Sequence, residues 1–501
     1  MSALVSALAQ HAADTPDACA LSDGLRAVSY AELTNAIDAA RHALRGSDTP
    51  VALALDNGPA WVTLDLALAG ARRTCLPLPP FFSEAQKRHA LRDAGAGLLL
   101  TDRPDAYEAG LREHGLHCKR LTDLVVAGIR VGRIDLTLPR ATLPADTVKI
   151  TYTSGTTDAP KGVCLGEAAI AAVARSLAAA VRFTPRDRHL ALLPLSLLLE
   201  NIAGIYAPLS AGACVLLPPL AEIGLAAGAG MSMERAAECL AKHRATTAIT
   251  VPELLAGLCR AIERGAPRPG TLRFLAVGGA RVPDELFRRA AAAGLPVYEG
   301  YGLTECASVV ALNTPQANRP GSVGRVLPHA GVTIADGEIH VRGATFLGYT
   351  HGSPFDGDCY PTGDLGRMDD DGFLYLTGRR RNVFITSYGR NVSPEWVESE
   401  LTASDAIAQA WVYGEALPWN FAVVTPREGA MPEAVEAAIA AVNLNLPDYA
   451  RVKRWIRSSE PFSPRNGQLT ANGRIRRSVL IKAYRHLLHE LYGENPDAVL
   501  R

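Results

Sequence analysis

The chain has 501 residues, of which 48% are hydrophobic and 20% charged, as is usual for a globular protein. Lys plus Arg and Asp plus Glu both number 51, so the net charge is zero. This balance argues against a nucleic-acid-binding protein and against electrostatic binding to an anionic membrane. A chain of this length exceeds what one hydrophobic core normally sustains, so we expect two or more domains.

Cysteine usage and hydropathy indicate the compartment. The nine cysteines form no C-x-x-C pair, so neither a zinc site nor a disulfide framework is expected. No window approaches 18 uninterrupted apolar residues, and residues 1–17 are typical of a packed amphipathic helix rather than a signal peptide. We therefore expect a cytoplasmic protein with no membrane span; the sequence does not indicate its oligomeric state.

Short apolar strands alternate with helices over the first three-quarters of the chain. The expected strands are 51–57, 97–102, 189–195, 214–219, 246–252 and 272–279. The expected helices are 61–71, 83–95, 234–243 and 283–294. This alternation predicts parallel α/β sheets that are buried on both faces.

After Gly321 the sequence pattern changes to shorter apolar segments separated by glycines. This pattern predicts a small barrel-like β subdomain. A basic run, GRRRN at 378–382, is typical of a hinge between domains. We expect a large N-terminal domain over residues 1–379 and a small, mobile α+β domain over residues 380–501.

The run TYTSGTTDAPKG at 151–162 follows an apolar, β-rich segment and predicts a strand that ends in a polar loop. Such a loop offers backbone N–H groups, hydroxyls and one ammonium to a polyanion such as a triphosphate. It is not a Walker P-loop, because Pro160 stands at the second required glycine. A surface turn is the alternative. The candidate phosphate ligands are Thr153, Ser154, Gly155, Thr156, Thr157 and Lys161.

Five motifs, taken in order, resemble the AMP-forming adenylating superfamily of acyl-CoA synthetases, adenylation domains and firefly-luciferase-type enzymes. They are TYTSGTTDAPKG, YGLTECAS (301–308), YPTGDLG (360–366), GRRRNVFITSYGRNVSPEWVESEL (378–401) and LTANGRIRR (469–477). The flanking sequence is most similar to the long-chain acyl-CoA synthetase branch, which implies fatty acid metabolism. The resemblance covers nearly the whole chain.

Small residues after an apolar strand let a flat ring lie against the backbone, and Tyr301 offers an aromatic face nearby. The resemblance implies that Glu299 meets the adenine amino group. A tight strand-to-helix turn is the alternative for this strand end. The residues expected around the adenine are Gly279, Ala280, Glu299, Gly300, Tyr301 and Gly302.

Four further residues are expected to hold phosphate, metal and ribose. Thr304 offers a hydroxyl to phosphate, and Glu305 a hard carboxylate oxygen to Mg²⁺, although a Thr-Glu pair also serves as a helix cap. The resemblance implies that Asp364 chelates the ribose hydroxyls and that Arg379 reaches the ribose or the phosphate.

Arg474 stands where the superfamily places its adenylation lysine. Arginine keeps the charge that stabilises the transferring phosphoryl group, but it is a planar fork with a different reach. Three outcomes stay open: Arg474 replaces the lysine, Lys453 or Arg476 does so, or adenylation is lost. A surface arginine is a fourth interpretation. The expected catalytic residues are Arg474, Lys161, Thr304 and Glu305.

The resemblance implies a hinge at Arg381 and, at Tyr388, a narrowed tunnel for the thiol. Leu197 replaces a frequent histidine, which leaves an apolar wall that suits a fatty or aryl acid; an ordinary core helix is the alternative. We expect Leu198, Asn201 and Gly278 to contact this acid.

We therefore expect an ATP- and Mg²⁺-dependent, AMP-forming ligase. It would activate a carboxylic acid as acyl-AMP and transfer the acyl group to CoA or to the phosphopantetheine of an acyl carrier protein. Two alternatives stay open. One is an adenylating enzyme with a non-thiol acceptor such as an amine or nitrite, and the other is a degenerate nucleotide-binding homologue.

Overall fold

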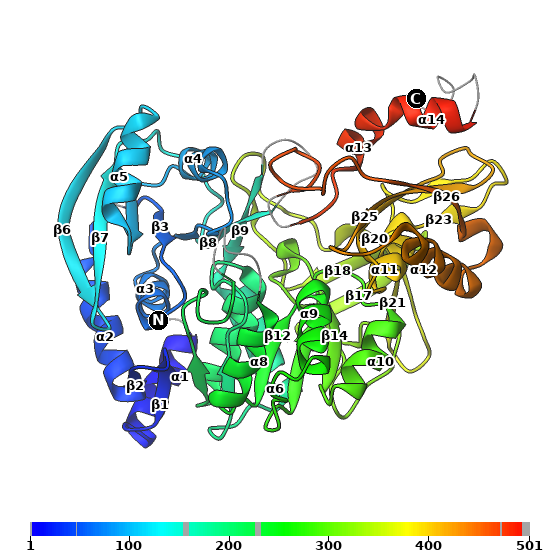
Figure 1. The fold of residues 1–501 in the computed structure, drawn as a ribbon. Helices are drawn as coiled ribbons and strands as arrows, with labels where there is room; N and C mark the ends of the chain where they lie inside the picture. Colours follow the sequence, from blue (N-terminus) through cyan, green and yellow to red (C-terminus); the bar gives the residue numbers. More distant parts are fainter. Residues whose placement is uncertain (1–2, 47, 154–159, 226–231, 471–472, 493–501) are drawn as a thin grey trace.

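The computed structural model describes residues 3–46, 48–153, 160–225, 232–470 and 473–492. Within these residues, no helix combines the length and the apolar character that crossing a membrane requires. Three larger sheets and two smaller ones organise the chain, and Figure 1 shows the C-terminal elements at the upper right.

The first sheet has eight strands in the order β19-β9-β8-β4-β3-β5-β7-β6. Its centre is parallel, and strands β3, β4 and β5 are almost completely buried, as their continuous apolar sequence predicts. The strands are β3 (Val51–Ala54), β4 (Cys75–Pro77), β5 (Leu98–Thr101), β6 (Cys118–Val126), β7 (Ile129–Leu136), β8 (Thr147–Thr153), β9 (Lys161–Gly166) and β19 (Gly348–Tyr349).

Helices α3 (Pro59–Gly70), α4 (Glu84–Asp93) and α5 (Pro104–Glu113) connect these strands. The start of α4 is fixed by a capping box, in which the Ser83 side chain accepts from the Gln86 N–H and the Gln86 side chain accepts from the Ser83 N–H. This helix ends at Asp93, beside the strands of the phosphate-loop motif.

The second sheet has nine strands in the order β16-β15-β14-β13-β12-β10-β11-β1-β2. Its six central strands are parallel, so the alternating pattern correctly predicted the α/β architecture. The strands are β1 (Cys19–Ser22), β2 (Ala27–Ser29), β10 (Arg188–Leu190), β11 (Cys214–Leu216), β12 (Thr247–Thr250), β13 (Phe274–Val277), β14 (Val297–Tyr301), β15 (Ala311–Leu312) and β16 (Arg325–Val326).

The remaining helical segments of this large region pack around the two sheets and include a π-helical segment, η1, and a short 3₁₀ turn, η2. They are α1 (Ala3–Asp14), α2 (Tyr30–Ala43), α6 (Glu167–Val181), η1 (Glu200–Tyr206), α7 (Ala207–Ser210), α8 (Met233–Lys242), α9 (Pro252–Glu263), α10 (Asp284–Ala292) and η2 (Thr304–Cys306).

The third sheet is antiparallel, with strands β17 (Ala330–Ala335), β18 (Glu338–Gly343), β20 (Tyr360–Met368) and β21 (Leu374–Arg379) in the order 17-18-20-21. The start of β21 also pairs with residues 323–325: the Val323 N–H donates to the Leu374 carbonyl oxygen at 2.8 Å, and the Leu374 N–H donates to the Gly324 carbonyl oxygen at 2.9 Å. This pairing links the four strands to β16, so the expected small β subdomain is present; its barrel-like closure stays a prediction.

The C-terminal region has two clusters of buried side chains of its own. A three-stranded sheet, β24 (Ile407–Tyr413), β25 (Asn420–Pro426) and β26 (Val452–Arg457), packs with a hairpin, β22 (Phe384–Ile385) and β23 (Asn391–Val392). The helices are α11 (Pro394–Thr402), α12 (Pro432–Asn445), η3 (Asp448–Ala450), α13 (Arg477–Ala483) and α14 (Arg485–Tyr492).

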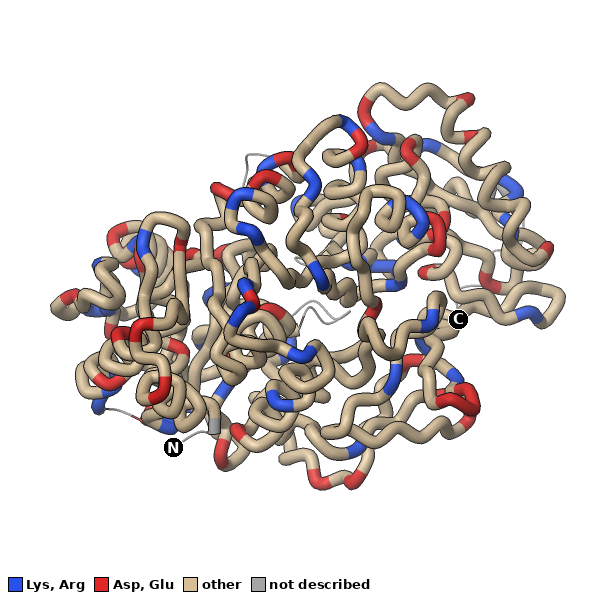
Figure 2. Tube along the Cα trace, turned by 90° about the horizontal axis from the view of Figure 1, so that it is seen from below, with Lys and Arg blue, Asp and Glu red and all other residues tan. Residues whose placement is uncertain are grey.

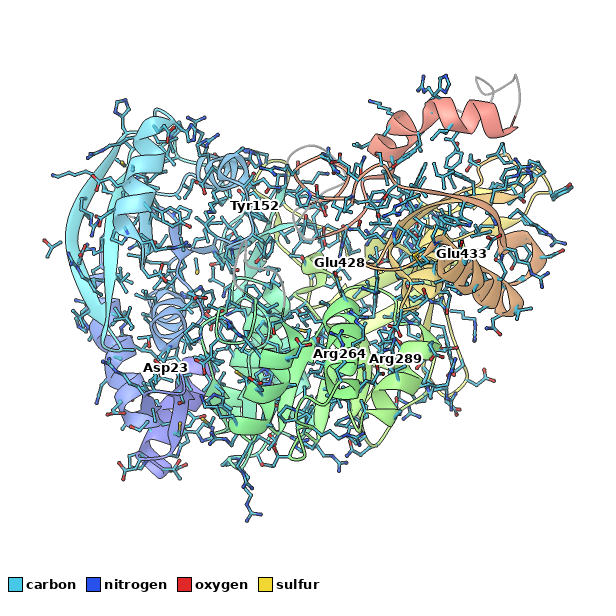
Figure 3. All side chains as sticks on the ribbon, in the orientation of Figure 1. Asp23, Tyr152, Arg264, Arg289, Glu428 and Glu433 are labelled. Carbon is cyan, nitrogen blue, oxygen red and sulfur yellow. The ribbon has the colours of Figure 1, made fainter. Side chains whose placement is uncertain are left out.

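Two arginines of the large region contact the C-terminal region. Arg289 on α10 hydrogen bonds to Glu263 and, at 2.9 Å, to Asp405 (Figure 3). The Arg281 guanidinium lies 5.6 Å from the ring centre of Trp396 and 3.9 Å from the Glu400 carboxylate. Over the chain as a whole, basic and acidic positions are interspersed in Figure 2, as the zero net charge predicts.

Candidate active site

The phosphate-loop motif spans two antiparallel strands, β8 and β9, in which Thr153 is paired with Lys161. Lys161 is exposed, and its Nζ atom lies 5.6 Å from the centre of the Tyr349 ring. The expected ligands Ser154, Gly155, Thr156 and Thr157 lie outside the described residues. Thr153 and Lys161 are therefore the expected ligands of this motif whose positions are described, one on each strand.

The adenine-side residues lie where β13 and β14 end together at one edge of the second sheet. Because these strands are parallel, their carboxyl ends form a shared crevice of the kind that binds ligands in open α/β sheets. A Cβ atom at Gly278 would lie 3.1 Å from the Gly300 carbonyl oxygen, so the two backbones run close together. Gly279 has a φ of 87°, a left-handed conformation that favours glycine, and Ala280 beside it is exposed.

Glu299 is only 6% exposed at the end of β14. Burial raises the pKa of its carboxyl group to about 8, and the backbone N–H of Val282, 3.4 Å from Oε1, offsets this only in part. The side chain is therefore mostly protonated at pH 7, with both a donor and an acceptor available. The adenine contact expected of Glu299 stays a prediction.

Tyr301, Asp364 and Arg379 form one hydrogen-bonded cluster. The Tyr301 hydroxyl donates to Asp364 Oδ2 at 2.8 Å, and Arg379 Nε donates to Oδ1 at 2.7 Å. Asp364 and Arg379 face each other because β20 and β21 pair in that register. Burial alone would lower the pKa of Arg379, but its hydrogen bonds to Asp364 outweigh this effect and raise the pKa. The sequence predicted these three residues at one nucleotide, and the structure brings them together.

Thr304 and Glu305 follow β14 in η2, a single turn of 3₁₀ helix. The chain reaches this turn through Gly302, where a Cβ atom would lie 1.6 Å from the Ser308 carbonyl oxygen, so only glycine fits. Glu305 is partly exposed, and its Oε1 accepts a hydrogen bond from the Tyr349 hydroxyl at 3.1 Å. Tyr349, which touches both Lys161 and Glu305, was not predicted as a site residue.

The Arg474 N–H donates to the Thr470 hydroxyl at 3.0 Å. Its side chain reaches water, yet desolvation by the surrounding protein lowers the pKa of the guanidinium. The charges of Arg379 and Arg381 lower it further, whereas those of Asp364 and Glu305 raise it. The C-terminal region thus places this cation within electrostatic reach of the cluster on the large region.

Two other cations were considered for this role. Lys453 is exposed on β26, and Arg476 donates to the Gly467 carbonyl oxygen at 3.4 Å. Tyr388, expected to narrow a thiol tunnel, is 74% exposed. Ser393 precedes α11, but its side chain makes no capping hydrogen bond; Pro394 fills the first helical position.

The residues expected to contact the acid divide into two groups. Leu198 is 6% exposed and belongs to the main core, and Gly278 lies at the crevice. Asn201, by contrast, is 1% exposed within η1, and its amide donates to Asp65 while its oxygen accepts from Lys149. These hydrogen bonds use both polar groups of the Asn201 side chain. The segment is therefore an ordinary core helix, the alternative given above, and the contact between Asn201 and the acid is no longer expected.

A small apolar cavity lies between α8, α9 and the carboxyl end of β12. Its lining comprises Leu192, Ile223, Leu225, Met233, Ala236, Thr250, Leu254 and Leu258. The Thr250 carbonyl oxygen accepts from the Gly278 N–H at 3.3 Å, so this cavity adjoins the crevice at the strand ends. Leu254 and Leu258 lie four positions apart on α9, and their place in the cavity depends on the packing of α9 against α8. Neither residue was predicted to line a cavity.

Comparison with known proteins places this geometry in context. Residues 8–350 match the family described as AMP-binding enzyme, and residues 381–496 match the AMP-binding enzyme C-terminal domain. A long-chain-fatty-acid–CoA ligase of Mycobacterium bovis, FadD15, is 26% identical over 87% of this chain and 86% of its own.

Two further proteins extend the likeness. The 2-succinylbenzoate–CoA ligase of Bacillus subtilis is 29% identical over 81% of this chain and 84% of its own. Among solved structures, the anthranilate CoA ligase AuaEII in complex with anthranoyl-AMP superposes with a TM-score of 0.78 at 20% identity and covers 96% of each chain.

Proposed function

Because this chain belongs to the AMP-binding enzyme family and is an AMP-forming acid–CoA ligase, we propose that its substrate is a fatty or aryl carboxylic acid. The acid is first joined to AMP with release of pyrophosphate, and the acyl group then passes to a thiol with release of AMP. The thiol is that of CoA, or of phosphopantetheine on an acyl carrier protein.

One observation carries the proposal: Tyr301, Asp364 and Arg379 of the large region meet in one hydrogen-bonded cluster. Arg474 of the C-terminal region lies within electrostatic reach of this cluster and of Glu305. When a carboxylate oxygen attacks the α-phosphorus, negative charge develops on the phosphoryl oxygens. A cation held at that point lowers the barrier, because its interaction strengthens as the charge grows. Arg474 supplies this cation in place of lysine, and Lys161 supports the outgoing phosphates.

The nucleotide would lie across the cluster of Tyr301, Asp364 and Arg379. In this arrangement Asp364 accepts from the ribose hydroxyls while Arg379 and Tyr301 hold its carboxylate in place. The raised pKa of Glu299 leaves its carboxyl group neutral and able to pair with the adenine edge.

Magnesium fits Glu305. The carboxylate is partly exposed at the crevice, and Mg²⁺ is usually held by one or two carboxylates together with substrate phosphates. Bound with ATP, the ion neutralises phosphate charge. The Tyr349 hydroxyl orients Glu305 for this contact by donating to Oε1.

The apolar cavity beside Gly278 supports the assignment of the acid. It is lined mainly by aliphatic side chains and in this conformation has room for about one water molecule. Widened by side-chain movement, such a lining would suit a hydrocarbon chain or an aryl ring better than a small polar acid. The free thiols of all nine cysteines fit a reducing cytoplasm. Rotation of residues 380–501 about Arg381 would then admit the thiol.

The test is ATP–pyrophosphate exchange across fatty, aryl and small polar acids. We expect exchange that depends on an apolar acid, and mass analysis of the products should then give an acyl-thioester with CoA or a carrier protein. Arg474→Ala should abolish exchange while thioester formation from supplied acyl-AMP persists, and the exposed Lys453→Ala serves as the control. If AMP binds but no acid of the panel supports exchange, the protein is a nucleotide-binding homologue without adenylating activity. Amide or nitrite products would change the acceptor.

A further inference from the structure

Asp93, the last residue of α4, contacts three polar side chains next to the strands of the phosphate-loop motif. Asp93 Oδ2 accepts from the Tyr152 hydroxyl and from the Thr350 hydroxyl, each at 2.5 Å. Its Oδ1 lies 2.7 Å from His351 Nε2. The Asp93 side chain is only 10% exposed, so these contacts are made largely out of water.

The two hydroxyl groups come from opposite sides of strand β9. Tyr152 lies on β8, where it pairs with Gly162, and Figure 3 shows it in the upper middle of the view. Thr350 follows β19 on the other side, and its N–H donates to the Gly162 carbonyl oxygen at 2.9 Å. Asp93 therefore ties together the strands that flank β9 on both sides.

The packing around Gly162 shows how close these groups are. A Cβ atom at Gly162 would lie 2.5 Å from Thr350 Cγ2 and 3.0 Å from Tyr152 Cζ. Because both side chains are also held by Asp93, neither is free to withdraw. The glycine after the lysine of the motif is therefore required by this packing, whatever the ligand of the loop.

The same arrangement reaches two of the residues expected to act on ATP. Lys161 directly precedes Gly162, and Tyr349 directly precedes Thr350. The Tyr349 ring lies beside Lys161 Nζ, and its hydroxyl donates to Glu305. A shift of Thr350 or Gly162 would therefore move Lys161 and Glu305 relative to each other.

We propose that Asp93 is a positioning residue for ATP: by holding Tyr152 and Thr350 on either side of β9, it sets the places of Lys161 and Glu305. This inference rests on the proposed function. Hydrogen bonds to an ionised carboxylate are about twice as strong as neutral ones, and a buried carboxylate makes them stronger still. His351 contributes less, because its side chain is 72% exposed and surface ion pairs are weak.

The variant that tests this is Asp93→Asn, which keeps the shape and removes the charge. We expect the dissociation constant of ATP·Mg²⁺, measured by calorimetry without any acid, to rise about tenfold, in keeping with the loss of one charge-assisted hydrogen bond. In the exchange assay the KM for ATP should rise to a similar extent. The KM for the acid and thioester formation from supplied acyl-AMP should change by less than about twofold.

His351→Gln is the matched control within the same cluster, and it should leave ATP binding unchanged. Should Asp93→Asn fail to fold, Tyr152→Phe removes a single hydroxyl and keeps the ring, with an expected rise of about threefold to tenfold. Equal losses in both half-reactions, or a lower thermal midpoint with an unchanged ATP dissociation constant, would overturn the inference and leave Asp93 a merely structural residue. Absence of ATP binding by the unsubstituted protein would instead overturn the proposed function and the inference together.

Discussion

The ion pair of Arg477 and Glu398 gives the sharpest stability prediction. Arg477 lies three residues after Arg474, at the start of α13, and Glu398 lies on α11. Arg477 Nη1 and Nη2 donate to the two carboxylate oxygens at 2.9 and 2.7 Å, a bidentate geometry. Glu398 Oε1 also accepts from the Val412 N–H at 2.8 Å, so the pair joins α13, α11 and β24.

The structure sets the size of the effect. The two side chains are only 17% and 9% exposed, so Arg477→Met leaves the Glu398 carboxylate buried without its counter-charge. Breaking a buried pair in this way typically costs about 3–5 kcal/mol, because the remaining charge has lost both partner and water. Replacing both residues, as in Glu398→Met with Arg477→Met, should cost less, since no buried charge remains.

Tryptophan fluorescence reports this change selectively, because four of the five tryptophans, at positions 396, 411, 419 and 455, lie in the C-terminal region. In guanidinium titrations, Arg477→Met should lower the midpoint of this signal without changing its slope. Lys453→Met, at an exposed position of the same region, should stay within about 0.5 kcal/mol of the parent. A loss below about 1 kcal/mol for Arg477→Met, or a double variant less stable than the single one, would refute the reasoning.

Three further outcomes are expected. Since burial raises the pKa of Glu299 to about 8, the folded protein keeps a proton that the unfolded chain loses near pH 4.5, so stability should fall as the pH rises between these values. Glu299→Gln should flatten that dependence in thermal unfolding measured from pH 5 to 9, and an unchanged slope would contradict the assignment. Tyr301→Phe removes the 2.8 Å bond to Asp364 and should raise the KM for ATP about tenfold, whereas an effect confined to the KM of the acid would count against a nucleotide site. Lys149→Met leaves the Asp65 carboxylate, which is 1% exposed, without its counter-charge. In calorimetric unfolding this should destabilise the large region by about 3–5 kcal/mol, and a change below about 1 kcal/mol would show that the pair is dispensable.

Sequence patterns predicted six of the buried parallel strands, β3, β5 and β10 to β13, because these segments are short and mainly apolar. The 51–57 and 97–102 segments became β3 and β5, with shorter bounds than expected. The motif residues Tyr301, Asp364 and Arg379 were also predicted together, and the structure joins them by hydrogen bonds. These residues could be predicted together because the resemblance assigns them to one nucleotide, and no knowledge of their packing was needed.

Residues whose roles depend on distant partners escaped prediction. Asn201 has the polar character of a binding residue, yet its partners are Asp65 and Lys149, 136 and 52 positions away. Tyr349 and Asp93 show no local pattern, because their contacts form only when β19 and α4 meet β8 and β9. The pairing of residues 323–325 with the start of β21 was not predicted either, since strand patterns indicate β structure but not which strands pair.

The contacts of Arg281 and Arg289 across the two parts of the molecule have a mechanical consequence. Each joins the regions through an ion pair with one partly exposed member: Asp405 is 66% exposed beside Arg289, and Arg281 is 39% exposed beside Glu400. Water and dissolved ions replace partners of this kind for about 0–1 kcal/mol apiece. An interface held by such partly exposed ion pairs costs little to separate and re-form, whereas an apolar interface of equal area would cost more. These contacts are therefore compatible with the movement proposed for residues 380–501.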